Sequence, residues 1–560
     1  MKKMPIGIDD FKELVRDYYY VDKTKFISEF LNEHAKVTLI TRPRRFGKTL
    51  LMSMLYYYFS VEEKDETRNL FSNLKVSREH YNGERGRYPV IFLSLKGIQN
   101  KNWDMMYGSF KRLIAKEFDT HSYILKKDIF TSAEKTFYNK IVNLSAEPED
   151  YQVSLLYLTE FLERYYDEKA VILIDEYDAP LQCAFDYSFY DDAIAYFKSW
   201  FNNSLKGNSH LAFAVMTGVL RIAKESIFSG LNNLEVDTVT TNKYGDSFGF
   251  TADEVNQMCR DYAHEHYEHN ASKLMESLKY WYDGYKFGNT EIYNPWSVTN
   301  FFYNHCMAKP YWINTSGNGI LKYLLTKTDA NKISMLYKLL TGENVAVTLN
   351  ESVIYDDISK DKTALLTMLL TTGYLTIDQV GHTYNRFTLK IPNEEIKQVY
   401  AIEILNHLLP NMERGDFDDF FDALFTGNVT VFSNKLRQII ENSASAFDTA
   451  GKECFYHGFM LGMIACFHPN GYLVESNRES GFGRFDLAII PEDNQRPAVI
   501  MEFKHAESEN KLAGAAKQGL QQIVDKNYVQ AIKAKHINKI LGYGISFFGK
   551  KIYVTNTTLK

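Results

Sequence analysis

Residues 37–59 are the part of this sequence that most constrains its fold. Residues 37–41 (VTLIT) are a short apolar, β-branched run, which predicts a buried strand. A basic turn follows at 42–47, and residues 48–59 (KTLLMSMLYYYF) then predict a helix. A strand, a turn and a helix in this order form the first unit of a parallel α/β fold.

Further apolar runs extend this pattern along the N-terminal half. Buried strands are predicted at 89–95, 170–174 and 211–217, and helical stretches at 103–117 and 152–167 separate them. Strands that alternate with helices favour a parallel sheet covered on both faces. We therefore predict a three-layer α/β domain over residues 1–250.

The chain has 560 residues, too many for one hydrophobic core, so further domains are expected. Residues 251–400 look helical, and a helix with a β-hairpin over 363–391 is compatible with a winged-helix-like lid. Residues 401–449 predict a helical connector. Residues 450–560 start with a helix and continue with strands and a second helix, which predicts a C-terminal α/β domain.

The composition is that of a globular protein, because 45% of residues are hydrophobic and 24% are charged. The formal net charge of −6 does not mark the whole chain as a nucleic-acid binder. The five cysteines show no paired spacing, which favours reduced thiols. The N-terminus turns acidic too early for a secretory signal, and no apolar run approaches the about 20 residues that span a bilayer. We expect a soluble, cytoplasmic protein with no membrane partner.

Residues 42–49 (RPRRFGKT) match the phosphate-binding pattern G-x-x-x-x-G-K-[ST], except that Arg42 replaces the first glycine. This chemistry needs backbone N–H groups at a helix N-terminus, which Arg45, Phe46 and Gly47 would supply. Lys48 would reach the phosphate oxygens, and the Thr49 hydroxyl would bind Mg²⁺. Taken alone, the motif does not exclude a chance Gly-Lys-Thr at the start of a helix.

A second acidic motif supports a nucleotide site. The predicted strand at 170–174 runs into Asp175 and Glu176. Asp175 stands where a carboxylate would bind Mg²⁺, and Glu176 where a base would activate water. Acids at a strand end can also cap the next helix, and we assign that structural role to Asp178.

Thr217 ends a further strand, and Arg221 follows it. Thr217 could sense the γ-phosphate, and Arg221 could supply charge in the transition state, in cis or in trans. Alternatively, Thr217 caps a turn and Arg221 pairs with a surface acid. The sequence leaves both alternatives open.

Four ordered motifs resemble the AAA-ATPase-like family of prokaryotic proteins: MPIGIDDFKELVRDYYYVDKT, RPRRFGKTLLMSML, LIDEYDAPL and TGVLRIAKESIFSGLNNL. The resemblance continues through YDGYKF and NPWSV, at residues 282–298. It implies that Arg-Pro-Arg-Arg is an ordinary start of the P-loop in such proteins. It also implies ATP as the ligand, and it places Tyr20 to Lys23 near the nucleotide base.

Two acids and a lysine form a second constellation. Glu502 and Lys504 are two residues apart on the predicted strand 498–504, so they share one face. If strands 486–490 and 498–504 pair as a hairpin, Asp486 lies beside Glu502. Two carboxylates could then hold a divalent cation while Lys504 orients the attacking water. Charges on a surface strand are the alternative.

The helix that follows carries Gln518, Gln522 and Lys526 at helical spacing, a face that could meet a phosphate backbone or simply be solvated. From Ile500 to the end there are ten lysines and four acids. Residues 450–560 resemble the PD-(D/E)xK nuclease superfamily, through ECFYHGFMLGM, GRFD, EFK and QQIVDKNY. That resemblance implies Asp486, Glu502 and Lys504 as the active site, with Gln522 as an auxiliary. By their positions upstream, Glu453 on the helix or Glu475 on the next strand could be a further ligand.

The expected function is an ATP-binding or ATP-hydrolysing domain that controls metal-dependent cleavage of nucleic acid, DNA rather than RNA, in defence or mobile-element biology. The cation would be Mg²⁺, with Mn²⁺ as the alternative. An arginine supplied in trans would be consistent with a homo-oligomer. One alternative is a non-catalytic ATP switch that binds nucleic acid or a partner without cleavage. Another is a P-loop phosphotransferase, for which the sequence offers no acceptor motif.

Overall fold

A computed structural model describes most of the chain. The described residues are 2–33, 35–78, 83–221, 234–266, 270–312, 339, 342–349, 361–383, 385–408, 418–442, 453–466, 472–476, 479–480, 483–526, 528–529, 532 and 537–559. Parts of the predicted lid and connector therefore lie outside the described residues. The chain divides into two compact units, of which the first comprises residues 1–311 and 347–387 and the second residues 312–346 and 388–560.

The first unit contains a five-stranded, wholly parallel sheet in the order β2-β3-β4-β1-β5. Its strands are β1 (Val37–Thr41), β2 (Val90–Ser94), β3 (Ala170–Asp175), β4 (Leu211–Gly218) and β5 (Leu234–Asp237). All residues of β1 and β3 are buried, as expected for strands with helices on both faces. Because β4 lies between β3 and β1, Thr217 is placed between Asp175 and the loop that follows Thr41.

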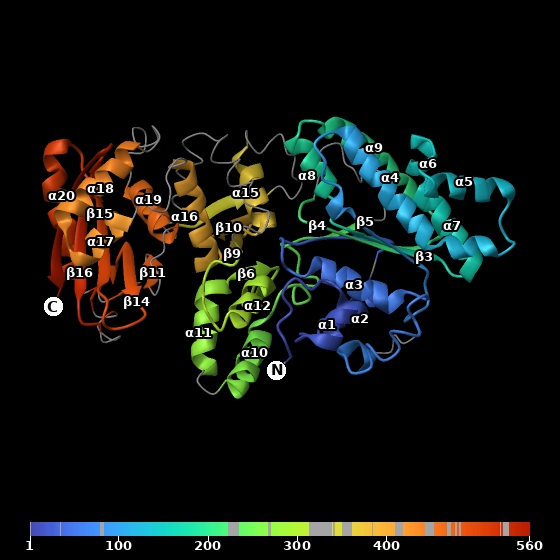
Figure 1. Ribbon diagram of the computed structural model, residues 1–560, viewed down its shortest axis with the longest axis horizontal. Helices are drawn as coiled ribbons and strands as arrows, with labels where there is room; N and C mark the ends of the chain where they lie inside the picture. The colour runs from blue at the N-terminus through green and yellow to red at the C-terminus, as the bar shows by residue number, and fades with distance from the viewer. Residues whose placement is uncertain are drawn as a thin grey trace. The chain divides into compact units, whose positions relative to one another are not determined.

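Helices cover both faces of this sheet (Figure 1). On one face lie α1 (Phe11–Asp17), α2 (Lys25–Glu33) and α3 (Lys48–Phe59). On the other lie α4 (Trp103–Thr120), α5 (Ser132–Val142), α6 (Pro148–Gln152), α7 (Ser154–Tyr166), α8 (Ala179–Asp186) and α9 (Tyr190–Leu205). This arrangement confirms the predicted three-layer α/β fold of the N-terminal half.

The first unit continues with helices and short strands that pack near the loop after β1. They are α10 (Ala252–Glu265), α11 (Ala271–Tyr282), the hairpin β6 (Tyr285–Phe287) and β7 (Thr290–Ile292), and α12 (Pro295–Tyr303). Further along the chain come β8 (Val345–Thr348), α15 (Lys362–Thr372), β9 (Thr376–Val380) and β10 (Arg386–Lys390). Thus α15 and the strands after it have the helix-then-strands order expected for 363–391. The predicted domain boundaries stay predictions.

The second unit contains a mixed five-stranded sheet in the order β11-β14-β15-β16-β17. Its strands are β11 (Tyr472–Ser476), β14 (Leu487–Pro491), β15 (Ala498–His505), β16 (Ile540–Phe548) and β17 (Lys551–Leu559), and β12 (Glu479–Ser480) pairs with β13 (Gly483–Arg484). Only β15 and β16 run parallel. This mixed sheet confirms the predicted α/β class of the C-terminal domain.

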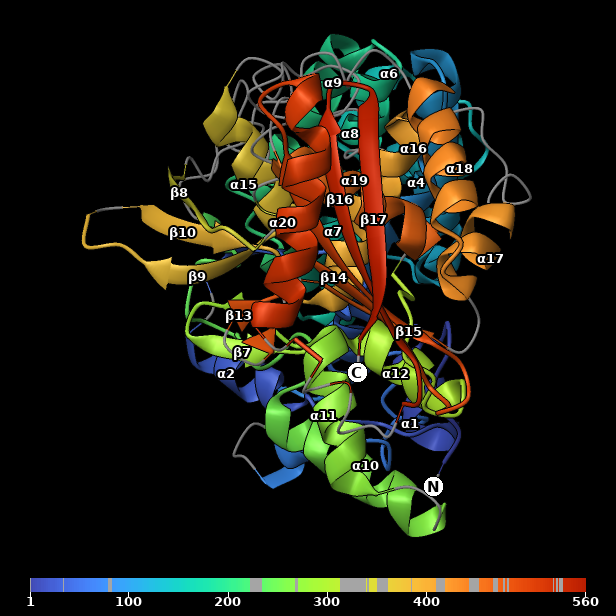
Figure 2. The same ribbon diagram turned by 90° about the vertical axis from the view of Figure 1, so that its left-hand side faces the viewer.

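Helices flank this second sheet as well (Figure 2). They are α16 (Glu394–Leu408), α17 (Asp418–Thr426), α18 (Val429–Asn442), α19 (Glu453–Cys466) and α20 (Leu512–Asp525). Helix α20 packs on β15 and β16 through glycines: a Cβ on Gly544 would lie 2.0 Å from the Ala516 carbonyl oxygen. The Tyr543 hydroxyl, one residue along β16, donates to the Leu424 carbonyl of α17. Because neighbouring side chains of a strand point to opposite faces, α20 and α17 cover opposite faces.

Candidate nucleotide and nuclease sites

The loop after β1 has the backbone of a phosphate-binding turn. It ends at Gly47, the N-cap of α3, whose φ of +87° is in the left-handed region that favours glycine. Arg45 also has a positive φ, of +70°. The first backbone N–H groups of α3 have no partner within the helix, and the helix dipole favours a negative charge there. The loop can therefore receive an anion at the start of α3.

Arg42, the residue in place of the first glycine, is fully buried. Its Nη2 lies 2.6 Å from Asp237 Oδ2 at the end of β5, and its Nη1 donates to the Thr41 carbonyl at 2.9 Å. Its guanidinium also lies over the rings of Phe248 and Phe287, at 4.9 and 5.1 Å. Burial lowers the pKa of Arg42, and the Asp237 carboxylate opposes that shift. Arg42 therefore anchors the loop to the end of β5 through buried contacts.

Three predicted residues, Lys48, Thr49 and Thr217, lie near Asp175, which is fully buried. The Thr49 hydroxyl donates to Asp175 Oδ2 at 2.8 Å, and the Thr217 hydroxyl donates to Asp175 Oδ1 at 2.5 Å. Lys48 Nζ donates to the carbonyl oxygens of Arg42 and Pro43, at 2.9 and 2.8 Å. Burial lowers the pKa of Lys48 to about 8, although the nearby Glu176 and Asp175 charges oppose this. The site thus combines a lysine, two hydroxyls and a buried carboxylate.

The residues after Asp175 take different roles. Glu176 has a φ of +52°, and burial raises the pKa of its carboxyl although the Lys48 charge opposes the shift. A half-buried carboxyl with a raised pKa near a lysine is suited to accept a proton. Asp178 is the N-cap residue of α8, but its side chain makes no capping hydrogen bond.

The prediction that the Asp178 side chain caps the next helix is therefore wrong. Its carboxylate accepts the N–H groups of Val219 and Leu220, at 2.9 and 2.8 Å. These amides follow β4, and a charged acceptor that satisfies two of them outweighs a helix cap. Asp178 consequently ties the turn after β3 to the turn after β4.

The second site lies on β14 and β15. Leu487 pairs with Met501, so one step further along the hairpin Asp486 stands opposite Glu502. Asp486 Oδ2 accepts the Phe503 N–H at 2.8 Å, and Lys504 Nζ lies 3.3 Å from Glu502 Oε1. The structure thus brings Asp486, Glu502 and Lys504 together, as strand alternation predicted.

Helix α20 completes this arrangement. A Cβ on Gly519 would lie 3.4 Å from the Glu502 carbonyl oxygen and the Lys504 side chain, so helix and strand pack closely there. One turn later, Gln522 Nε2 donates to Glu502 Oε1 and to the Tyr528 hydroxyl. Gln522 therefore contacts Glu502 of the acidic pair, whereas Lys526, the C-cap of α20, is exposed.

The acidic pair fits a divalent cation. Glu502 is buried, and its Oε2 has no hydrogen-bond partner among the described residues. Burial and the nearby Asp486 carboxylate raise the pKa of Glu502 to about 8. A buried carboxylate oxygen without a partner is costly unless a cation or a proton satisfies it. Among the described residues no three His, Cys, Asp or Glu side chains could hold a metal alone, so water or a phosphate would complete its oxygen ligands.

Two family models match parts of this chain. A family model described as Predicted AAA-ATPase matches residues 5–228, and a model of the PD-(D/E)XK nuclease superfamily matches residues 451–557. The chain combines an AAA-ATPase-like domain with a PD-(D/E)XK nuclease domain. The two matched ranges contain the loop before α3 and the Asp486–Glu502–Lys504 group, respectively.

A relative from Azotobacter chroococcum mcd 1 carries the name "Uncharacterized protein in vnfD 5'region". It is 26% identical over 552 residues, which make up 95% of this chain and 94% of the relative. The similarity therefore extends through the middle region, which neither family model covers. In the part of the chain that the structure describes, no helix is long and apolar enough to cross a membrane.

The ATPase-like domain contains supporting residues that sequence reasoning missed. Phe46 is buried against Tyr285 and Phe287 of the β6–β7 hairpin, with ring centroids 5.0 and 5.1 Å apart. The Arg45 guanidinium lies 4.1 Å from the ring centre of Trp296 on α12. The motifs YDGYKF and NPWSV thus pack against the P-loop, and their aromatic residues were the available signal.

The segment from Tyr20 to Lys23 joins α10 to the N-terminal region. Lys23 Nζ donates to Glu254 at 2.6 Å and to the Asp246 carbonyl at 2.7 Å, and Asp22 accepts the Lys75 N–H at 2.7 Å. These contacts give the segment a role in holding α10. The expected position near a nucleotide base remains a prediction.

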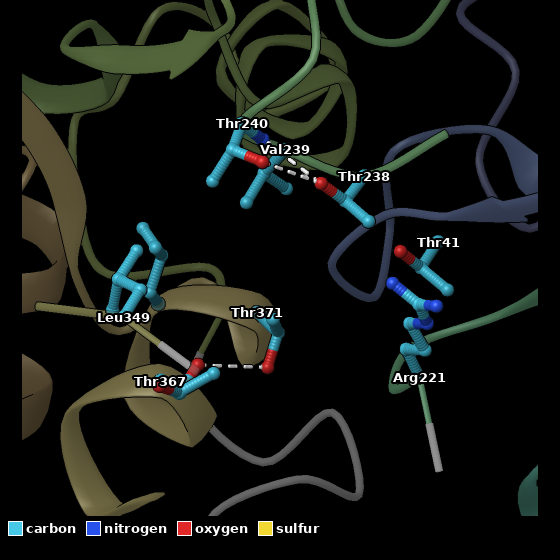
Figure 3. A pocket seen from close by; sticks show the side chains of 9 residues that line it. Thr41, Arg221, Thr238, Val239, Thr240, Leu349, Thr367 and Thr371 are labelled. Atoms are coloured by element: carbon cyan, nitrogen blue, oxygen red, sulfur yellow. Dashed lines mark hydrogen bonds between the residues drawn. The ribbon is translucent and has the colours of Figure 1, made fainter. Parts of the chain in front are cut away.

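Arg221 lines a small cavity (Figure 3). Its guanidinium points toward Thr41, and the other lining residues are Thr238, Val239, Thr240, Leu349, Thr367, Leu370 and Thr371. The cavity measures about 10 Å³, which is room for about one water molecule. Residues 222–233 lie outside the described part, and both predicted roles of Arg221 stay open.

The nuclease domain contains a buried histidine that sequence reasoning did not single out. His457 on α19 is hydrogen-bonded to the Asp486 backbone and lies 5.7 Å from the Phe503 ring, centre to centre. Burial lowers the pKa of His457 to about 3, so the imidazole is neutral. Of the other candidate ligands, Glu475 on β11 is buried, and the Glu453 side chain lies outside the described part.

Proposed function

We propose that the nuclease domain hydrolyses phosphodiester bonds in nucleic acid with the help of a divalent cation, and that ATP at the P-loop controls this activity. The observation that carries the proposal is the buried Glu502 Oε2, which has no hydrogen-bond partner among the described residues and belongs to a carboxylate beside Asp486 and Lys504. Lys504 reaches the other oxygen, Oε1, so a cation would supply the partner that Oε2 lacks.

The residues of the nuclease site divide the work. Asp486 and Glu502 would hold the cation, and Mg²⁺ is the expected ion, with Mn²⁺ as the alternative. When bound, the cation neutralises charge on the phosphate and lowers the pKa of a bound water. Lys504 orients the attacking water and stabilises negative charge on the phosphoryl oxygens. Gln522 fixes the Glu502 carboxylate through its amide N–H.

The P-loop residues supply the nucleotide site. The backbone of Arg45, Phe46 and Gly47 would receive the phosphates at the start of α3, and Lys48 would leave the loop carbonyls to bind them. Thr49 and Asp175 would bind the Mg²⁺ that accompanies ATP, and their mutual hydrogen bond already places them together.

Hydrolysis of ATP would use two more residues. Glu176 would accept the proton of the attacking water, because its pKa is raised and Lys48 is close. Thr217 would sense the γ-phosphate from its position beside Asp175, to which its hydroxyl donates. The proposal leaves Arg221 either as a charge donor at the nucleotide or as a structural residue.

The proposed substrate is DNA rather than RNA. Gln522 and the exposed Lys526 are the proposed contacts to its phosphate backbone. They belong to the segment from Ile500 to the end, which contains ten lysines and four acids. The proposal also includes a cytoplasmic location, assembly into a homo-oligomer, and a role in defence or mobile-element biology. Light scattering with and without ATP tests the assembly.

The test is cleavage of labelled DNA and RNA by the full-length protein, in Mg²⁺ or Mn²⁺, with and without ATP. Lys504→Ala should lose cleavage, and Lys48→Ala should lose its ATP dependence. Lys435→Ala and Lys116→Ala are matched controls, because both side chains reach the surface and lie outside the two sites and outside the lysine-rich segment that starts at Ile500. Both control proteins should cleave as the wild type does.

The outcome separates this proposal from the non-catalytic switch. Cleavage by wild type and controls, but not by Lys504→Ala, supports a nuclease. Absence of cleavage on every substrate, with ATP still bound in a Lys48-dependent way, favours the switch that binds nucleic acid or a partner. ATP control is contradicted if the wild type cleaves equally well with and without ATP and Lys48→Ala cleaves as the wild type does.

A further inference from the structure

The three arginines of the loop, Arg42, Arg44 and Arg45, have different surroundings. Arg42 is buried beneath the loop and Arg44 Nη2 donates to Gln182 at 3.0 Å, whereas Arg45 stacks on an aromatic ring. The distance of 4.1 Å from the guanidinium carbon to the Trp296 ring centre is well inside the about 6 Å range of a cation–π contact. Arg45 also has a backbone φ of +70°, which is uncommon for residues other than glycine.

Trp296 is itself fixed in place. It lies in the first turn of α12, where its N–H donates to the Asn294 side chain at 3.0 Å. The edge of its indole also donates, from Nε1, to the Tyr311 carbonyl at 3.1 Å. The face of the ring therefore meets Arg45, while its edge is bonded to the last residue before the chain leaves the first unit.

Both cations of the loop that could meet phosphate are bound to protein. Lys48 Nζ donates to two carbonyl oxygens of the loop, and Arg45 lies on Trp296. A triphosphate would attract both, because a charge-assisted hydrogen bond to a phosphate oxygen is stronger than a bond to a neutral acceptor. For Arg45, leaving the indole means giving up a cation–π contact.

We propose that Trp296 is a positioning residue that competes with ATP for Arg45. In the nucleotide-free loop the indole holds the guanidinium, and in the ATP-bound loop Arg45 leaves the ring for the phosphates. Because the same ring is bonded to Tyr311, its release or capture links nucleotide binding to the end of the first unit. This inference rests on the proposed nucleotide site at Lys48.

Competition and a purely structural role of Trp296 predict opposite changes in ATP affinity when the indole is removed. Loss of the indole removes a contact made only in the nucleotide-free state, so it raises the population of loops that are ready to bind. A cation–π contact at a partly exposed site corresponds to an affinity gain of about two- to fivefold. A residue that only supported the loop would instead weaken ATP binding when removed.

The experiment is calorimetric titration of full-length protein with ATP and Mg²⁺. Trp296→Leu should bind ATP about two- to fivefold more tightly than wild type, and Trp296→Phe, which keeps an aromatic face, should fall between them. Tyr303→Leu is the matched control, an aromatic residue of the same helix that is exposed, and its affinity should equal that of wild type.

The outcomes keep the two proposals apart. Tighter binding by Trp296→Leu with Trp296→Phe intermediate supports the competition. The role of Trp296 is overturned if both Trp296 variants bind ATP no more tightly than the wild type while Tyr303→Leu binds it equally well. That result leaves the nucleotide site intact. Wild type that binds no ATP, or binds it as well in Lys48→Ala, overturns the proposed site and this inference with it.

Discussion

The pair Arg42–Asp237 yields the sharpest prediction about the P-loop. Asp237→Asn keeps the shape of the side chain but removes its charge, so the guanidinium of Arg42 stays buried without its counter-ion. We expect this change to destabilise the first unit strongly. The physical reason is that a buried charge without a partner costs far more than the pair contributes when complete.

The magnitude follows from the contacts of Arg42. Breaking a fully buried pair typically costs about 3–5 kcal/mol. Here the carbonyls of Thr41 and Lys243 still accept from the guanidinium and two aromatic faces remain, whereas its Nε has no partner among the described residues. We therefore expect the lower part of that range, about 3 kcal/mol, or more than a hundredfold in the folding equilibrium.

The assay is pulsed hydrogen exchange along a urea series, read on peptides of β1 and β5, because a chain of two units has no single unfolding transition. Glu29→Gln is the matched control: its pair with Lys25 has the same N–O distance of 2.6 Å, but the two side chains are 57% and 33% exposed. It should change stability by less than about 1 kcal/mol. Arg42→Met combined with Asp237→Leu should regain most of the loss. A cost for Asp237→Asn no larger than that for Glu29→Gln would refute the argument.

Three further predictions concern single side chains. His457→Leu should reduce cleavage about 10- to 100-fold, with His457→Gln less affected, because the ring holds the Asp486 backbone; initial rates across a Mn²⁺ series test this. Glu502→Gln should abolish the rise in the unfolding temperature of the second unit on adding Mn²⁺, whereas Glu509→Gln, an exposed acid, should keep it. Burial lowers the pKa of His121, but bonds to two glutamates outweigh this and raise it to about 9. The stability that His121 contributes is thus fully present below its ordinary value of about 6.5 and is lost as pH rises through about 9. The free energy of unfolding of His121→Gln should therefore depend less on pH between about 6.5 and about 9 than that of the wild type.

The nuclease site was largely predictable because its geometry is local. Strand alternation places Glu502 and Lys504 on one face, and a short turn between β14 and β15 fixes the register that sets Asp486 opposite Glu502. The sequence did not reveal that Gly519 and Gly544 let α20 approach the sheet closely. That approach, rather than helical spacing alone, brings Gln522 to the acids.

The P-loop could be found from sequence, but its supports could not. The strand, the turn and Gly-Lys-Thr are adjacent in the chain, whereas Arg42 and Asp237 are 195 residues apart and no local pattern pairs them. For the same reason the partner of Asp178 was missed, since the amides that it accepts lie 41 and 42 residues away. Position at a strand end predicted that Asp178 would cap a helix, and tertiary contacts decided otherwise.

These supports explain how a loop without the first glycine can keep its form. That glycine serves a tight turn that any side chain would hinder. In this chain Arg42 instead turns inward to Asp237, Phe46 packs on the β6–β7 hairpin, and Arg45 rests on Trp296, so contacts from outside the loop replace backbone freedom within it. A loop that is held from outside can also be moved from outside. If the proposed nucleotide moves this loop, we expect the partly exposed stack of Arg45 on Trp296 to break first, because it is weaker than the buried ion pair or the buried contacts of Phe46.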